Sequence, residues 1–278
     1  MFIIQIPYLS LDQTFKSGQH LRWIKINDDK FIIINGSKIV KVSQNRDRFC
    51  FDCTEAEFYD TWYDYFDIGT DYLLYNYRIN KIDEDFVKQS SNRGRGIRII
   101  KQGIFEVTVA SILDYLFDGD AGLVDVTIDI ICNICGKKHK NSIREAGKIT
   151  WYEFPSVEQI LNRSDWVRTI LNNDKVSTIL LTICEYISNN GYKKLPTYLR
   201  HMFGDDYISS SIKLYALHKL NYMPINGEIV NIFITEFDCD DADDFFYWYI
   251  NYDKDVESIC GLLGRYLYYN KNNSPRRL

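Results

Sequence analysis

Two pairs of cysteines have the spacing of metal-binding motifs. Cys50 and Cys53 form one CxxC pair, and Cys132 and Cys135 form the other. Four thiolates with this spacing could bind a structural zinc ion. The first pair lies in a strand-like alternation, where residues three apart point to opposite faces. The second lies near the end of a predicted helix, where cysteine is a common core residue. The pattern leaves zinc open but favours buried free thiols, and we expect no metal and no cofactor.

Basic side chains are clustered in places where they could bind an anionic partner. Lysine and arginine neutralise the phosphates of nucleic acids, so such clusters are candidate nucleic-acid or partner contacts. The same clusters are also compatible with solvated surfaces, and Arg98 with a structural role. The candidate contacts are Arg93, Arg95, Arg98 and Lys101 in one group and Lys137, Lys138 and Lys140 in another.

The densest acidic stretch lies towards the C-terminus. Aspartates in such a stretch can cap a helix and stay solvated, or they can form a surface for a basic protein partner. The candidate acidic residues are Asp238, Asp240, Asp241, Asp243 and Asp244. Three of the histidines, His20, His201 and His218, show neither a triad pattern nor metal-ligand spacing.

Composition indicates an ordinary globular protein. Hydrophobic residues make up 46% and charged residues 26%, and the formal net charge is −5, so a DNA contact would have to be a local basic patch. The seven cysteines, an odd number, fit a reducing compartment. No apolar run reaches the roughly 18–20 residues of a membrane span. The first seven residues resemble a strand rather than a signal peptide. We expect a cytoplasmic protein without a membrane contact.

Strand signals dominate the first part of the chain and helix signals the rest. Residues 1 to about 80 are strand-like, and Asn35-Gly36 between two β-branched runs predicts a β-hairpin. Within this part, residues 60–72 are expected to form a short helix and a connection. Later, Ser156 with Gln159 three residues on predicts a capped helix start. Helices are predicted at about 104–117, 121–135, 157–161, 174–189, 206–217, 228–237, 242–252 and 255–270.

This order of elements predicts an α+β fold. A β-rich N-terminal domain would cover residues 1–95 and a helical domain residues 96–270. Residues 271–278 are expected to be a loose tail. The Gly-rich basic segment at 92–96 is expected to be a flexible joint between the two domains.

Six segments of this chain resemble six signature motifs that occur in the same order in a known family. Residues 15–23 resemble SGQxFRW, 65–72 resemble YFDLxxDY, 96–106 resemble GIRILxQDPWE, 154–156 resemble an FPS turn, 216–226 resemble ALGKxDxFPVD, and 261–269 resemble the last helix of the set. Together they resemble the 8-oxoguanine DNA glycosylases of the helix-hairpin-helix superfamily. The resemblance implies a β-rich domain followed by a helical domain that contains the hairpin. It also implies flipping of a damaged guanine out of the duplex, with a lysine that forms a Schiff base at C1′ and an assisting aspartate.

The catalytic positions implied by this resemblance hold other residues. Counting back from the segment at 224–226 places the family lysine at Tyr207 and the family aspartate at Asn226. An asparagine amide neither accepts a proton nor carries a charge. Of the glycines in the family hairpin only Gly204 remains, and Asp205 and Asp206 would lie near the DNA phosphate. The ordinary Schiff-base chemistry is therefore expected to be absent.

The loop implied to fill the space left by the flipped base is also altered. It falls at 114–120, where Leu116 or Phe117 could act as an apolar wedge. The same two side chains are also compatible with a place in the core.

Three functions are compatible with these residues. The first is an inactive glycosylase reused for binding a protein partner, for example as a viral or mobile-element inhibitor of a nucleic-acid-processing defence complex. The second is a non-catalytic module that binds damaged or distorted DNA. The third is an active glycosylase in which a carboxylate such as Asp205, Asp206 or Glu228 activates water.

Overall fold

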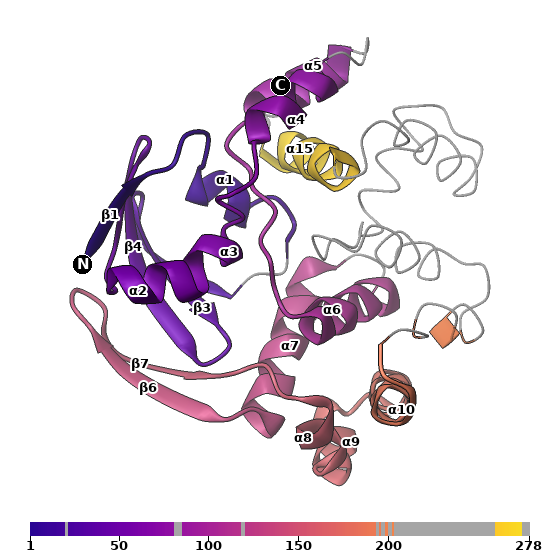
Figure 1. Cartoon of the computed structure of the whole chain (residues 1–278). Helices are drawn as coiled ribbons and strands as arrows, with labels where there is room; N and C mark the ends of the chain where they lie inside the picture. The colour runs from indigo at the N-terminus through magenta and orange to yellow at the C-terminus, as the bar shows by residue number, and fades with distance from the viewer. Residues whose placement is uncertain are drawn as a thin grey trace.

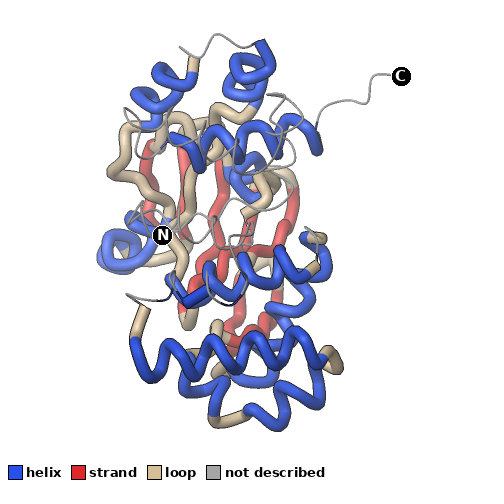
Figure 2. Tube along the Cα trace, turned by 90° about the vertical axis from the view of Figure 1, so that its right-hand side faces the viewer, coloured by secondary structure: helices blue, strands red, loops and turns tan. Residues whose placement is uncertain are grey.

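An antiparallel sheet followed by helices gives the protein an α+β fold, as the sequence predicts (Figure 1). The computed structural model describes residues 1–19, 22–80, 85–117, 120–192 and 259–273, together with Leu195, Tyr198, Leu199 and Met202. Figure 2 shows the strands in the middle of the molecule, with helices above and below them. No helix among the described residues is long and apolar enough to cross a membrane.

Five antiparallel strands form the N-terminal sheet, in the order β1-β5-β4-β3-β2. The predicted hairpin is confirmed, since Asn35 pairs with Lys38 across the turn. Gly36 in this turn has a φ of +56°, which glycine adopts without strain. The strands are β1 (Phe2–Gln5), β2 (Trp23–Asn27), β3 (Lys30–Asn35), β4 (Lys38–Asn45) and β5 (Arg48–Phe51).

Short helices interrupt the N-terminal part. The short helix expected within 60–72 agrees with helical turns that end at Tyr65, whereas helices at Leu11–Phe15 and Tyr72–Ile79 make the strand-like prediction wrong in part. Aromatic residues favour strands by propensity, but here Phe58, Trp62 and Phe66 recur at the helical period and are fully buried. Phe58 and Phe66 both pack against Phe51 of the sheet. The helices are α1 (Leu11–Phe15), α2 (Glu55–Glu57), the π-helical η1 (Phe58–Trp62), α3 (Tyr63–Tyr65), α4 (Tyr72–Ile79) and α5 (Asp85–Arg93).

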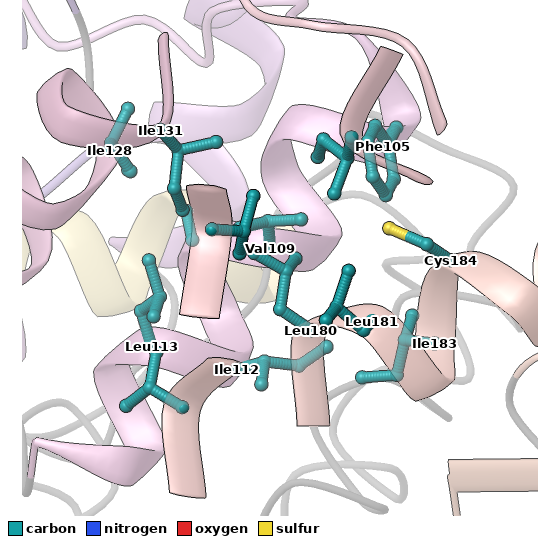
Figure 3. Close-up of a cluster of buried hydrophobic side chains, with 14 of the residues drawn as sticks. Phe105, Val109, Ile112, Leu113, Ile128, Ile131, Leu180, Leu181, Ile183 and Cys184 are labelled. Carbon is teal, nitrogen blue, oxygen red and sulfur yellow. The ribbon is translucent and has the colours of Figure 1, made fainter. Parts of the chain in front are cut away.

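The helices of the second part pack around an apolar core of their own (Figure 3). Val109 and Leu113 from α6, Ile128 and Ile131 from α7, and Leu180 from α10 converge there. The predicted bounds agree with the structure for α7 and α8 and differ by one residue for α6 and α10. These helices are α6 (Ile104–Leu116), α7 (Ala121–Cys135), α8 (Val157–Leu161), α9 (Ser164–Leu171) and α10 (Asp174–Asn190).

The start of α8 confirms the predicted capping box. Gln159 donates its backbone N–H to Ser156 Oγ at 3.2 Å, and Ser156 donates its own N–H to Gln159 Oε1 at 2.8 Å. The structure also contains a short helix, α9, that the sequence analysis did not predict.

A two-stranded ribbon between α7 and α8 was likewise not predicted. It consists of β6 (Lys138–Ile143) and β7 (Gly147–Tyr152). The turn between its strands has no Asn-Gly signal, and polar residues occupy both faces of β6, so the apolar alternation of a strand is absent. Gly136 lets the ribbon leave α7, because a Cβ at this position would collide with the backbone carbonyl of Glu153.

The last described helix, α15 (Ile259–Asn273), packs against α5 and α4. Figure 1 shows these three helices together at the top of the molecule. The helix extends to Asn273, three residues into the segment expected to be loose. Residues 274–278 lie outside the described part of the chain.

Candidate nucleic-acid interface

The segment that resembles SGQxFRW is held by its own side chains against the segment that resembles GIRI. We call Ser17–Gln19 the SGQ loop. Gln19 Nε2 donates to Ser17 Oγ and to the carbonyl of Arg98, both at 2.9 Å. Gln19 Oε1 accepts the backbone N–H of Ile100 at 2.8 Å. One glutamine thus fixes the loop to a segment about eighty residues away in the sequence.

Arg98 is a structural residue. Its side chain is buried, with 4% of the residue exposed. The guanidinium donates to the carbonyl of Asp67 at 2.8 Å and to that of Pro7 at 3.1 Å, and it lies 4.4 Å from the ring centre of Tyr72. A guanidinium enclosed in this way cannot reach a phosphate, which corrects the placement of Arg98 among the candidate nucleic-acid contacts.

Asp67 joins the second signature segment, 65–72, to the same network of hydrogen bonds. Its buried carboxylate accepts hydrogen bonds from Thr70 Oγ1 at 2.7 Å and Tyr72 Oη at 2.9 Å, and it forms an ion pair with Lys101 Nζ at 2.8 Å. Tyr72 Oη in turn accepts the backbone N–H of Ile99. Burial raises the pKa of Tyr72 well above its ordinary value, so its phenol remains a donor. Lys101, another candidate contact, is half-buried and engaged in this pair.

The last helix closes the SGQ loop from the other side. Arg265 of α15 is buried, and its Nη1 donates to the carbonyl of Gly18 at 2.6 Å. Gly18 has a φ of +77°, and a Cβ there would lie 3.0 Å from the ring of Tyr268. Only glycine therefore fits this position comfortably. Four signature segments thus meet in one place and bind one another.

The basic segment at 92–96 is packed, which corrects the expectation of a flexible joint. The carbonyl of Gly96 accepts the N–H of Ser10 at 2.7 Å, and a Cβ at Gly94 would collide with Tyr266. Arg93 donates to Asn270 Oδ1 at 2.9 Å, and the guanidinium of Arg95 lies over the ring of Tyr8. Both arginines remain exposed, so their charges are available at the surface.

The basic ribbon places its lysines on one face. Lys138 pairs across the ribbon with Tyr152, Lys140 with Thr150, and Lys148 with Ser142. Paired residues share a face, and these lysines are exposed. The six paired residues of this outer face include three lysines and no carboxylate. Lys137, also exposed, precedes the first strand.

The other face of the ribbon anchors it to the N-terminal sheet. Trp151 Nε1 donates to the carbonyl of Gly36 at 3.2 Å, and the Trp151 ring stacks on His139. Lys30 forms an ion pair with Glu145 at 2.7 Å near the ribbon turn. Arg22 of the first signature segment donates to the carbonyl of Tyr152. These contacts turn the lysine face towards solvent.

A cleft of about 760 Å³ lies between the β3–β4 turn and the helices. Glu106, at the start of α6, lines it together with Glu153, Phe154 and Tyr192. Burial raises the pKa of the Glu106 carboxyl to about 7, and the nearby Arg22 opposes this rise. The sequence analysis did not single out Glu106, although it lies in the segment that resembles GIRILxQDPWE.

Replacing Glu106 should remove a pH-dependent cost to stability. The raised pKa means that the folded protein holds a proton which the unfolded chain has lost between about pH 4.5 and 7. The free energy of unfolding therefore falls as pH rises through this range. Glu106→Gln is expected to be more stable than the wild type by about 1–2 kcal/mol at pH 8 and equal to it at pH 4. Urea denaturation at both pH values measures this.

The control for that measurement is Glu158→Gln, which changes an exposed carboxylate of the same cleft. It should alter stability by less than about 0.5 kcal/mol at either pH. An equal effect of the two variants would contradict the assignment to Glu106.

The described cysteines do not assemble a zinc site. No group of three or more possible ligands occurs among the described residues. Cys53, Cys132 and Cys135 are buried, as expected for core thiols, and Cys50 is half-buried. Burial raises the pKa of Cys132 to about 12, so its side chain is a neutral thiol.

Several predicted site residues lie outside the described part of the chain. They are the two positions that the resemblance implies for the catalytic lysine and aspartate, the expected hairpin residues, and the carboxylates considered for a water-based reaction and for a partner surface: Tyr207, Asn226, Gly204, Asp205, Asp206, Glu228, Asp238, Asp240, Asp241, Asp243 and Asp244. The two residues considered as a wedge are described, and Leu116 and Phe117 pack partly buried against the helical core.

The N-terminal part of the chain matches a known protein domain. Residues 1–107 match the family model of the 8-oxoguanine DNA glycosylase N-terminal domain. No curated protein sequence matches the chain.

Solved structures of DNA glycosylases match along nearly the whole chain. The 8-oxoguanine glycosylase/lyase of Clostridium acetobutylicum, in complex with double-stranded DNA containing cytosine opposite 8-oxoguanine, has a TM-score of 0.79 and 20% identity and covers 99% of both chains. MBOgg1 in complex with a low affinity DNA ligand has a TM-score of 0.78 and 20% identity, over 97% of this chain and 94% of that one. The 3-methyladenine DNA-glycosylase of Archaeoglobus fulgidus has a TM-score of 0.68 and 13% identity, over 99% of both.

These likenesses define the fold as that of DNA glycosylases. The domain match covers the N-terminal sheet. It also covers the hydrogen bonds that join the SGQ loop to Arg98 and Arg98 to Asp67, whereas the contact with Arg265 of α15 lies outside residues 1–107. Residues 1–107 thus match the N-terminal domain of 8-oxoguanine DNA glycosylases, and the chain as a whole has the fold of DNA glycosylases.

Proposed function

We propose that this protein binds DNA through its glycosylase fold and does not carry out the Schiff-base reaction. The observation that carries the proposal is a contrast within one chain. The fold matches a DNA-bound glycosylase/lyase over 99% of both chains, whereas the sequence resemblance implies Tyr207 at the position of the family lysine and Asn226 at that of the aspartate. A phenol lacks the amine that an imine requires.

The retained motif residues support binding without this chemistry. Gln19, Asp67, Arg98 and Arg265 bind protein groups rather than project from the surface. They fix the sheet, the loop at 97–100 and the last helix relative to one another. Selection for a rigid binding surface would keep these residues even after the loss of the catalytic lysine.

The lysine face of the ribbon supplies charge for a DNA contact. Each neutralised phosphate contributes about −0.9 to the slope of log K against log salt. We expect low-salt binding to duplexes that contain 8-oxoguanine or an abasic site. Changing Lys138, Lys140 and Lys148 together to Gln is expected to reduce the magnitude of this slope by about 1–3.

Fluorescence anisotropy at several salt concentrations measures the slope for both proteins. The matched control replaces Lys16, Arg48 and Lys175 by Gln, which removes the same charge from α1, β5 and α10. An equal change of slope in the two triple variants would exclude the ribbon as a specific contact. Absence of binding to intact, damaged and single-stranded DNA at low salt would refute the proposed function.

A further inference from the structure

A small polar pocket lies between α4 and α5, apart from the ribbon and from the cleft at Glu106. One face of α4 lines it with Leu73, Asn76, Tyr77 and Asn80, which follow the helical spacing of three and four residues. The end of α5 and the following turn add the remaining lining residues, which are Ser91, Asn92 and Arg95. The pocket has a volume of about 240 Å³.

Asn76, which lines this pocket, has a side-chain donor without a hydrogen-bond partner among the described residues. Its side chain is buried, with 4% of the residue exposed. Asn76 Oδ1 accepts a hydrogen bond from Tyr266 Oη at 2.6 Å, which fixes the orientation of the amide. Its Nδ2 has no hydrogen-bond partner in the described part of the chain. A buried donor without a partner destabilises the fold, so a ligand that supplies an acceptor to this amide would offset that cost.

The described residues that line the pocket carry one positive charge. Arg95 contributes the one charged side chain among its described lining residues, and none of them is a carboxylate. The guanidinium lies over the ring of Tyr8, 4.7 Å from its centre. Arg95 also acts on the neighbouring Tyr266: burial raises the pKa of that phenol, and the charge of Arg95 opposes the rise. Both the hydrogen bond of Asn76 and the charge of Arg95 therefore act on the Tyr266 phenol.

We propose that this pocket binds a tetrahedral oxyanion, namely inorganic phosphate or the terminal phosphate of a nucleotide. The Asn76 amide and the Arg95 guanidinium are donors that an oxyanion satisfies, and Asn80, Ser91 and Asn92 add polar groups around it. A phosphate would give Asn76 Nδ2 its missing partner. The proposal is independent of DNA binding through the ribbon, because the two sites share no residue.

NMR titration of the isotope-labelled full chain tests the proposal. Inorganic phosphate and adenosine 5′-monophosphate are added separately at constant ionic strength, and the side-chain amide of Asn76 is followed. Adenosine, which has no phosphate, and sodium chloride are the negative controls. Saturable shifts of the Asn76 amide are expected with phosphate, with the nucleotide, or with both, and these outcomes distinguish the source of the oxyanion.

Two variants and one control assign the site. Arg95→Gln is expected to raise the Kd for phosphate about tenfold or more, through the loss of a charge-assisted hydrogen bond. Asn76→Asp keeps the acceptor for Tyr266 but replaces the donor with a negative charge, so binding should be lost. Arg48→Gln, on an exposed part of β5, should leave the Kd unchanged. Thermal melting without phosphate verifies that each variant folds.

The outcomes separate this proposal from the proposed function. Shifts that are absent with both ligands, or that persist unchanged in Arg95→Gln, would overturn the oxyanion site. Salt-dependent DNA binding that needs the ribbon lysines would be unaffected by that failure. If the wild-type protein binds phosphate but does not bind DNA at low salt, the proposed function is refuted and the oxyanion site is not.

Discussion

On a duplex carrying 8-oxoguanine opposite cytosine, the protein is expected to form no covalent complex on borohydride reduction. It should also leave the strand intact. Borohydride traps an imine, and an imine needs a primary amine at C1′. Tyr207 cannot supply one, and Asn226 cannot act as the assisting carboxylate. The rate of strand scission should lie several orders of magnitude below that of an 8-oxoguanine glycosylase/lyase assayed in parallel.

A double variant tests whether positions 207 and 226 correspond to the catalytic lysine and aspartate. Tyr207→Lys combined with Asn226→Asp restores both residue types, and a trapped complex in this variant would show that the two positions face the sugar. Cleavage by the wild-type protein would contradict the inactive state and support a water-based reaction. Asp205→Asn, Asp206→Asn and Glu228→Gln would then identify the carboxylate by loss of that activity.

Removal of the Asp67 carboxylate is expected to have the largest effect on stability. Asp67→Ala deletes the acceptor of Thr70, Tyr72 and Lys101 in a buried site. It also places alanine at a φ of +50°, where aspartate is better tolerated. The free energy of unfolding should fall by about 3–5 kcal/mol. Asp67→Asn keeps the shape and one acceptor, so it should cost about 1–2 kcal/mol.

Urea denaturation followed by tryptophan fluorescence measures these differences, because Trp62 is buried near the network. Asp64→Ala is the matched control, since Asp64 is exposed on α3, three residues away. It should change stability by less than about 0.5 kcal/mol. If Asp67→Ala costs no more than Asp64→Ala, the network does not hold the signature segments together.

Local patterns in the sequence predict the regular elements well where the pattern itself is regular. The Asn35-Gly36 turn and the capping box at Ser156 depend on neighbouring residues, and both are confirmed. The bounds of α7 and α8 follow from helical periodicity. The ribbon was missed because β6 has polar residues on both faces: His139 and Asn141 alternate with Lys138 and Lys140, so no apolar strand period appears.

The sequence by itself determined the class of fold, the order of the signature segments and the residue types at positions 207 and 226. These are properties of chain order and residue identity. Only the tertiary structure decided that Arg98 is buried, that the segment at 92–96 is packed, and that Lys138, Lys140 and Lys148 share a solvent face. The partners of Gln19, Asp67 and Arg265 likewise come from distant segments. Burial and pairing depend on contacts between such segments, and no local pattern specifies them.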